Sequence, residues 1–125
     1  MRIIKFRKWH KELQDMTFWD GSKGSNNLFW HTLTEYPEMY SLMQFTGLYD
    51  KNGKEIYEGD IVSYKRNVGN WTGKSLTTIH EIIFTEEINA FVMKDNSGYI
   101  KLRKHWGYEY EVIGKIYENP ELLNQ

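Results

Sequence analysis

The first residues of the chain alternate between apolar and charged side chains. A period of two is typical of a β-strand, because successive side chains point to opposite faces. The pattern predicts a first strand over residues 2–9, with Ile4 and Phe6 turned inward. Lys5 and Arg7 then point outward to solvent.

Glycine-marked turns divide the middle and the end of the chain into short strands. Gly53 follows an asparagine, a pair that supplies the positive φ angles of a tight reversal. Four strands of ordinary length are predicted in the second half of the chain. They cover residues 79–84, 90–94, 99–103 and 110–117.

The remaining segments carry little regular periodicity. Residues 20–27 and 66–78 combine glycines with polar side chains, which predicts loops. Residues 31–43 have helical spacing, and Thr34 is placed to cap such a helix. Pro120 suits the first position of a short C-terminal helical turn.

These elements predict a mainly β fold, α+β at most. Short strands joined by glycine turns favour a small bent antiparallel sheet or an SH3-like, partly open barrel. At 125 residues the chain has the size of one domain with one core.

Composition and charge exclude several classes of protein. The formal net charge is −1, so the chain lacks the overall positive field of a typical nucleic-acid-binding domain. It has no cysteine, which excludes disulfides and thiolate metal sites. No apolar run approaches the roughly 20 residues of a spanning helix, and no signal peptide is evident. We therefore expect a cytoplasmic protein with no membrane partner.

Aromatic residues are abundant, at 16% of the chain, with five Trp and nine Tyr. In a β-rich protein such rings usually fill the core and rim of a sheet. The alternative is an exposed platform that stacks on bases or contacts another protein.

Three blocks of sequence carry a resemblance to a known family. They cover residues 1–9, 43–62 and 111–123, and the second contains the run Glu58-Gly59-Asp60 before a strand. In order and spacing they resemble the YopX family of phage and prophage proteins. The resemblance implies a β-rich fold and an origin in a phage or a prophage-bearing bacterium. It supplies no catalytic residues, because the molecular function of the family is not established.

The resemblance extends over nearly the whole chain and implies a single YopX-like domain over residues 1–125. Within it, residues 1–41 either belong to the compact unit or form a less compact N-terminal part. In the second case they pack on a β core of residues 42–125.

No catalytic centre or cofactor is predicted. The four histidines are too scattered for a metal site, and His80 is interpreted as a single, partly buried imidazole. A metal-dependent nuclease is the enzymatic alternative, and it would require the fold to gather carboxylates. The candidates are Glu55, Glu58, Asp60, Glu86 and Glu87. The more common role for Asp60 is to accept a hydrogen bond from a turn amide.

Basic residues cluster near the N-terminus, where residues 1–13 carry a local charge of +4. If the strand at 2–9 neighboured the strand at 99–103, cations and two tryptophans would form one positive surface. The candidate contacts with a partner or nucleic acid are Lys5, Arg7, Trp9, Lys101, Arg103 and Trp106. The more common interpretation is that such charges keep a sheet face in water.

The sequence favours a non-enzymatic domain that acts through protein–protein contact or self-association. Its partner would be a second copy, in a homo-oligomer, or another phage or host protein. The alternative is an accessory nucleic-acid-binding protein that uses the basic strand face, which is less favoured because the chain is slightly acidic.

Overall fold

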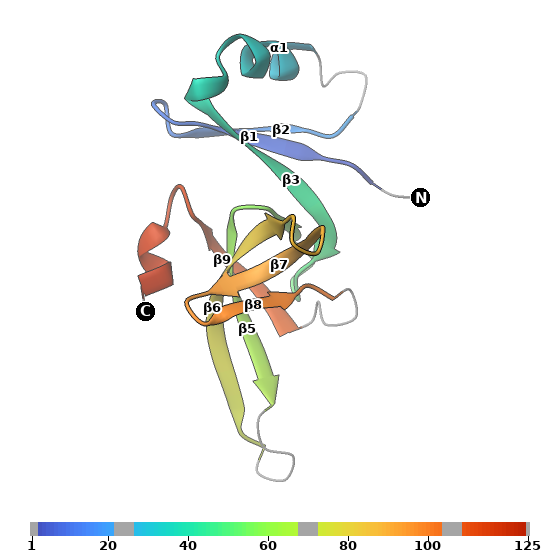
Figure 1. Cartoon of the computed structure of the whole chain (residues 1–125), viewed down its shortest axis with the longest axis vertical. Coiled ribbons are helices and arrows are strands. Elements are labelled where there is room, and N and C mark those ends of the chain that lie inside the picture. The colour runs from blue at the N-terminus through green and yellow to red at the C-terminus, as the bar shows by residue number, and fades with distance from the viewer. Residues whose placement is uncertain (1–2, 22–26, 68–72, 104–108, 125) are drawn as a thin grey trace.

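The computed structural model describes residues 3–21, 27–67, 73–103 and 109–124 and contains two antiparallel sheets (Figure 1). A four-stranded sheet has the order β2-β1-β3-β4, and a five-stranded sheet has the order β8-β7-β6-β5-β9. The elements of the first part are β1 (Phe6–His10), β2 (Asp15–Trp19), α1 (Asn27–Glu35), the 3-10 turn η1 (Pro37–Met39), β3 (Tyr40–Tyr49) and β4 (Glu55–Tyr57). Those of the second are β5 (Asp60–Asn67), β6 (Ser75–Thr85), β7 (Ala90–Asp95), β8 (Gly98–Lys101), β9 (Tyr110–Lys115) and the 3-10 turn η3 (Pro120–Asn124).

The five-stranded sheet curls into a half-open barrel, which confirms the prediction of a mainly β, partly open fold (Figure 1). Buried side chains from β4 to β9 fill its concave side. They are Ile56, Val62, Tyr64, Ile82, Met93, Leu102 and Tyr110. The predicted C-terminal helical turn is also confirmed, since Pro120 begins the 3-10 turn η3.

The predicted orientation of the side chains in the first strand is wrong. Arg7 is 2% exposed, whereas Ile4 is 49% exposed. The reason is that β1 is covered on both faces, so alternation does not separate buried from exposed positions. On one face, Phe6 contacts Trp30 of α1, and on the other, Trp9 stacks on Tyr117 beyond β9.

The predicted helix lies earlier than the sequence indicated. The helix α1 ends at Glu35, and Pro37 starts a 3-10 turn that leads straight into β3. A residue before proline is driven out of the helical region, and Tyr36 has φ −131° and ψ 58°. Thr34 therefore lies inside the helix, where its hydroxyl donates to the Trp30 carbonyl at 2.8 Å.

β3 is the strand that passes from the N-terminal sheet toward the barrel. Its first half pairs with β1, and its second half pairs with β4. The predicted turn follows, with Gly53 at φ +80°. The buried Asp50 carboxylate accepts hydrogen bonds from the N–H groups of Asn52 and Lys54 and from that of Val112 on β9, each at 2.9 Å. One side chain thus ties this turn to the edge of the barrel.

Of the predicted loop at residues 66–78, positions 68–72 lie outside the described residues, and the flanking parts are mainly strand. β5 continues to Asn67 and β6 begins at Ser75, and these two residues pair. The sequence shows no apolar periodicity here because this part of the hairpin buries little apolar surface. Of the predicted loop at residues 20–27, positions 22–26 lie outside the described residues.

The two sheets meet at a buried ion pair between β1 and the start of β5. Arg7 Nη2 lies 2.8 Å from Asp60 Oδ1 and also donates to the Glu58 carbonyl at 3.1 Å. Asp60 Oδ2 accepts the N–H of Tyr57 at 2.8 Å, which confirms its predicted role as an acceptor for a turn amide. The guanidinium lies 4.6 Å from the centre of the Tyr57 ring. Burial raises the pKa of the Asp60 carboxyl, and the Arg7 charge acts in the opposite direction.

Gly59 lies where the backbone passes close to Met43 and to this ion pair. Its φ is +87°, and an added Cβ would lie 2.8 Å from Met43 Sδ and 3.7 Å from Arg7 Nη2. Gly47 has the same φ of +87°, but an added Cβ there would meet nothing within 4 Å. The two glycines therefore share the same left-handed backbone conformation and differ in the room available to an added Cβ.

We expect Gly59→Ala to be more destabilising than Gly47→Ala, by about 1–3 kcal/mol in the free energy of unfolding. Both changes carry the cost of a left-handed backbone, so the difference reports the packing of Met43 against Gly59. Urea unfolding of the two variants measures it. Equal losses would show that the space beside Gly59 is not constrained.

Candidate functional site

The structure does not bring the predicted basic contacts together. Lys5 and Arg7 lie in or beside the N-terminal sheet, whereas Lys101 and Arg103 lie at or just beyond β8, which pairs with β7. Trp9 is 5% exposed, so Trp9 and Arg7 are both too buried to belong to an outward-facing surface. Trp106 lies outside the described residues. The predicted continuous positive face is therefore wrong, and binding by Lys5, Lys101 and Arg103 stays a prediction.

Four of the five carboxylates considered for a nuclease already have structural partners, among them Asp60 in its ion pair with Arg7. Glu55 forms an ion pair with Lys5, and Glu58 accepts the N–H of Gln44 at 3.1 Å. Glu87 accepts the Tyr99 hydroxyl at 3.2 Å on another part of the barrel. Within the described ranges, no three His, Cys, Asp or Glu side chains gather as a metal site.

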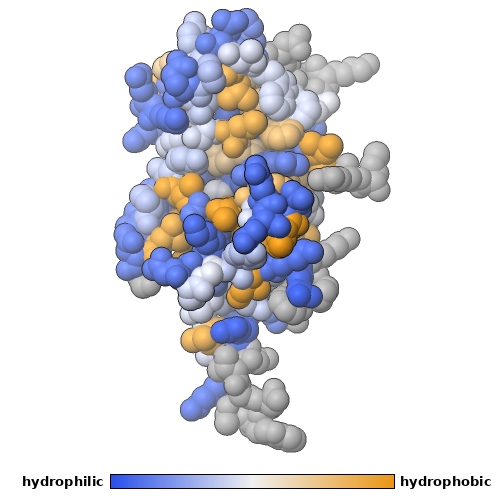
Figure 2. Space-filling model, viewed as in Figure 1, coloured by the Kyte–Doolittle hydropathy of each residue, from blue (hydrophilic) through white to orange (hydrophobic). Residues whose placement is uncertain are grey.

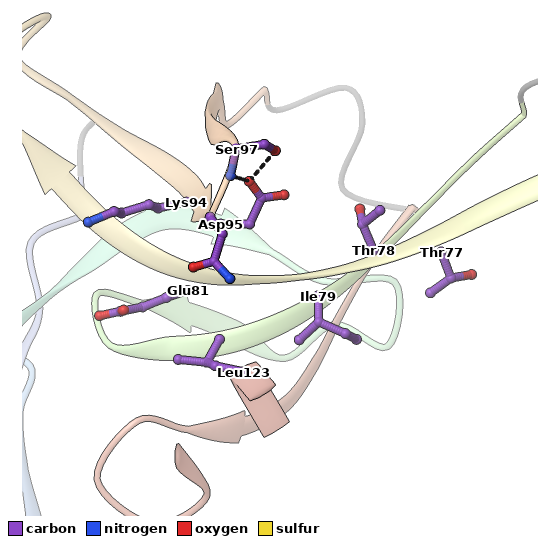
Figure 3. Close-up of a pocket in the computed structure, with 9 residues that line it drawn as sticks. Thr77, Thr78, Ile79, Glu81, Lys94, Asp95, Ser97 and Leu123 are labelled. Atoms are coloured by element: carbon purple, nitrogen blue, oxygen red, sulfur yellow. Dashed lines mark hydrogen bonds between the residues drawn. The ribbon is translucent and has the colours of Figure 1, made fainter. Parts of the chain in front are cut away.

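A groove of about 730 Å³ lies on the outer side of the barrel, between β6, the end of β7 and η3 (Figure 3). Its size falls in the range of ligand-binding clefts. Most of its lining residues are polar, with charges of both signs, and two are large and apolar. The lining residues are Thr77, Thr78, Ile79, Glu81, Lys94, Asp95, Asn96, Ser97 and Leu123.

A smaller hollow of about 130 Å³ lies beside the groove and shares Thr78, Asp95 and Ser97 with it. Arg66 and the buried His80 also line this hollow. Thr78 and His80 are two residues apart on β6, so they share a face of the strand. Asp95 and Ser97, at the turn between β7 and β8, line both the groove and the hollow, so this turn contributes to both.

His80 is the most buried polar residue at this site, with its side chain 3% exposed. Its Nε2 lies 2.7 Å from the Thr78 hydroxyl, and its Nδ1 lies 3.5 Å from Asp95 Oδ2. Among the described residues, Nδ1 has no hydrogen-bond partner. Burial lowers the pKa of the imidazole, with the Asp95 carboxylate opposing and Arg66 adding to the shift. The ring is therefore neutral at pH 7.

Asp95 is held in place by the turn that follows it. Its Oδ1 accepts the Ser97 hydroxyl at 2.7 Å and the Ser97 N–H at 2.8 Å (Figure 3). These hydrogen bonds from Ser97 lower the pKa of the Asp95 carboxyl. The carboxylate is thus a fixed negative charge at the border of the two spaces.

The order carboxylate, imidazole and hydroxyl is the order that activates a hydroxyl nucleophile. Here the Asp95 and His80 side chains are too poorly aligned for a hydrogen bond, and the imidazole is sealed from solvent. In the groove, Glu81 pairs across the sheet with Lys94, and burial raises the pKa of Glu81. The arrangement supplies hydrogen bonds and paired charges, so it suits binding better than chemistry.

The sequence reveals part of this site. The buried His80 was expected from its face of the strand, and it is 2% exposed. The groove itself was missed, because Leu123 reaches β6 only through the fold. The short run from Asp95 to Gly98 is a turn signal that could have indicated Ser97 as a partner for Asp95.

Comparison with known proteins identifies the family. The model of the YopX protein family matches residues 5–124, so the chain belongs to this family. The crystal structure of protein EF1440 from Enterococcus faecalis is similar, with a TM-score of 0.65 and 28% sequence identity. The match covers 98% of this chain and 99% of that one. A comparison with curated proteins gave no match.

The described part of the chain has no helix long and apolar enough to cross a lipid bilayer.

We expect His80 to make the protein less stable as the pH falls below about 6.5. The pKa of His80 is lowered in the folded state, so unfolding takes up a proton in this range. The raised pKa values of Asp60 and Glu81 act in the opposite direction. The test is therefore the comparison of the wild type with His80→Gln, by urea unfolding at pH 7 and pH 5.

The loss of stability between the two pH values should be smaller in His80→Gln than in the wild type. His31 is exposed, and His31→Gln should keep the wild-type difference. An unchanged difference in His80→Gln would contradict the neutral, buried state of this imidazole.

Proposed function

We propose that this YopX family protein is a non-enzymatic binding domain that takes a short, extended peptide segment of another protein in the groove beside β6. The observation that carries the proposal is the groove of about 730 Å³, lined by hydroxyls, an amide and paired opposite charges. Polar groups that converge in a cleft of this size fix the orientation of a ligand.

The spacing of the lining favours an extended peptide. Thr77, Ile79 and Glu81 occupy alternate positions on β6, so their side chains repeat every ~6.6 Å along one face. An extended peptide repeats its own side chains at the same interval. Side chains of such a peptide can therefore meet successive side chains of β6 in register.

The chemistry of the groove defines the occupant further. Glu81 and Lys94 stand opposite each other across β6 and β7, and each offers a charge to a ligand group of opposite sign. Ile79 and Leu123 offer apolar contact from β6 and from η3. The expected ligand is a segment with an apolar side chain flanked by charged residues.

A binding role is favoured over catalysis because the only imidazole at the described site is buried and does not line the groove. His80 lines the smaller hollow instead, and its side chain is 3% exposed. We place this binding in the cytoplasm of a bacterial host cell, with a phage or host protein as the partner, as the expectations from the sequence imply. No cofactor is part of this proposal.

A library of random peptides displayed on a carrier tests the proposal, with the purified chain as bait. The wild type should enrich one common sequence, and Leu123→Arg should weaken binding of that peptide about tenfold or more. Ile88→Arg is the matched control, because Ile88 is exposed at 44% and does not line the groove. It should bind within about twofold of the wild type.

Two results would overturn the proposal. One is the absence of any common peptide, or a common peptide that binds Leu123→Arg as well as the wild type. The other is a dimer in sedimentation that Leu123→Arg abolishes, because the occupant of the groove would then be a second copy of the chain.

A further inference from the structure

The hairpin of β5 and β6 extends beyond the rest of the barrel. β9 pairs with β5 only as far as Tyr64, and β7 pairs with β6 only from Glu81 onward. Residues 65–67 and 75–77 therefore pair with one another alone. Figure 1 shows this two-stranded ribbon projecting from the body at the end opposite the N-terminal sheet, and Figure 2 shows hydrophilic side chains at this end of the molecule. We call residues 65–67 and 73–77 the arm.

The arm differs from the rest of the chain in charge. Residues 64–80 include Lys65, Arg66 and Lys74 and no aspartate or glutamate. Since the whole chain has a formal charge of −1 and this segment contributes +3, the remaining residues carry −4. Both lysines and the arginine are exposed. The molecule therefore has a positive projection on a negative body.

We propose that the arm binds the sugar-phosphate backbone of double-stranded DNA. A two-stranded β-ribbon has the dimensions to enter the major groove, and cations on both of its strands would then face phosphates. Lys65 lies opposite Thr77 on the neighbouring strand, which also carries Ser75, so two hydroxyls accompany the cations. Such groups also donate hydrogen bonds to phosphate oxygens.

The charge distribution favours DNA over other anionic partners. The rest of the molecule has a net charge of −4, whereas the arm projects away from it and its charged side chains are all positive. A membrane surface is the other anionic partner to consider, and it would need apolar side chains to insert, so anionic vesicles are included in the test. This binding goes beyond the peptide groove and uses different residues, apart from Thr77 at the base of the arm. It also differs from the basic face expected from the sequence, which the fold does not assemble.

Contacts of this kind to phosphates carry little sequence preference and depend strongly on salt. Three phosphate contacts predict a slope of about −2.7 in log K against log salt, or roughly 40-fold weaker binding for a fourfold rise in salt. The fluorescence anisotropy of a labelled duplex of random sequence, titrated with the full chain, measures this slope.

The deciding variant is Lys65→Glu with Lys74→Glu, which leaves Arg66 in the smaller hollow unchanged. We expect it to reduce duplex affinity at low salt about 100-fold or more, with the thermal midpoint of unfolding unchanged. The matched control is Lys11→Glu with Lys54→Glu. It makes the same change in net charge at two exposed turns of the N-terminal sheet. This control should lose no more than about threefold.

Three results would overturn the proposal. The wild type could fail to bind duplex even at low salt. The control pair could lose as much affinity as the arm pair, which would assign the effect to net charge. Polyglutamate or vesicles rich in anionic lipid could compete as well as unlabelled duplex, which would make the arm a general anion surface. Retention of peptide binding by the arm variant separates this test from that of the groove.

Discussion

The buried ion pair between Arg7 and Asp60 is the contact on which the arrangement of the two sheets depends. It joins the second residue of β1 to the first residue of β5, and both side chains are almost fully buried. A buried charge that loses its partner is costly, whereas the pair with its accompanying hydrogen bonds is tolerated. The partners here include the Glu58 carbonyl and the N–H of Tyr57. The pair therefore fixes the place at which the barrel begins.

Both proposed binding surfaces follow from the incomplete closure of the barrel. The outer face of β6 remains open beside the turn after β7, and η3 returns to it with Leu123 to form the groove. At the other end, β5 and β6 run on after their neighbouring strands have stopped. A closed barrel would have neither feature. The same hairpin thus supplies one wall of the groove and the whole of the arm.

The sequence predicts local structure where a single residue type determines it. Gly53 predicts its turn, Pro120 predicts the start of η3, and the hydrogen-bonding role of Asp60 follows from its place after a glycine. The burial of Arg7 could not be predicted, because alternation does not show that α1 and the barrel cover opposite faces of β1. The groove could not be predicted either, since it requires the contact of β6 with η3.

The most direct test of this account is a double-mutant cycle on the ion pair, with Arg7→Met, Asp60→Asn and the double variant compared by urea unfolding. Each single change leaves a polar or charged group buried without its partner and should lower the free energy of unfolding by about 3–5 kcal/mol. The double variant should recover about 2 kcal/mol or more of the summed loss. Losses that add to within about 0.5 kcal/mol would show that the two residues act independently and would contradict the account.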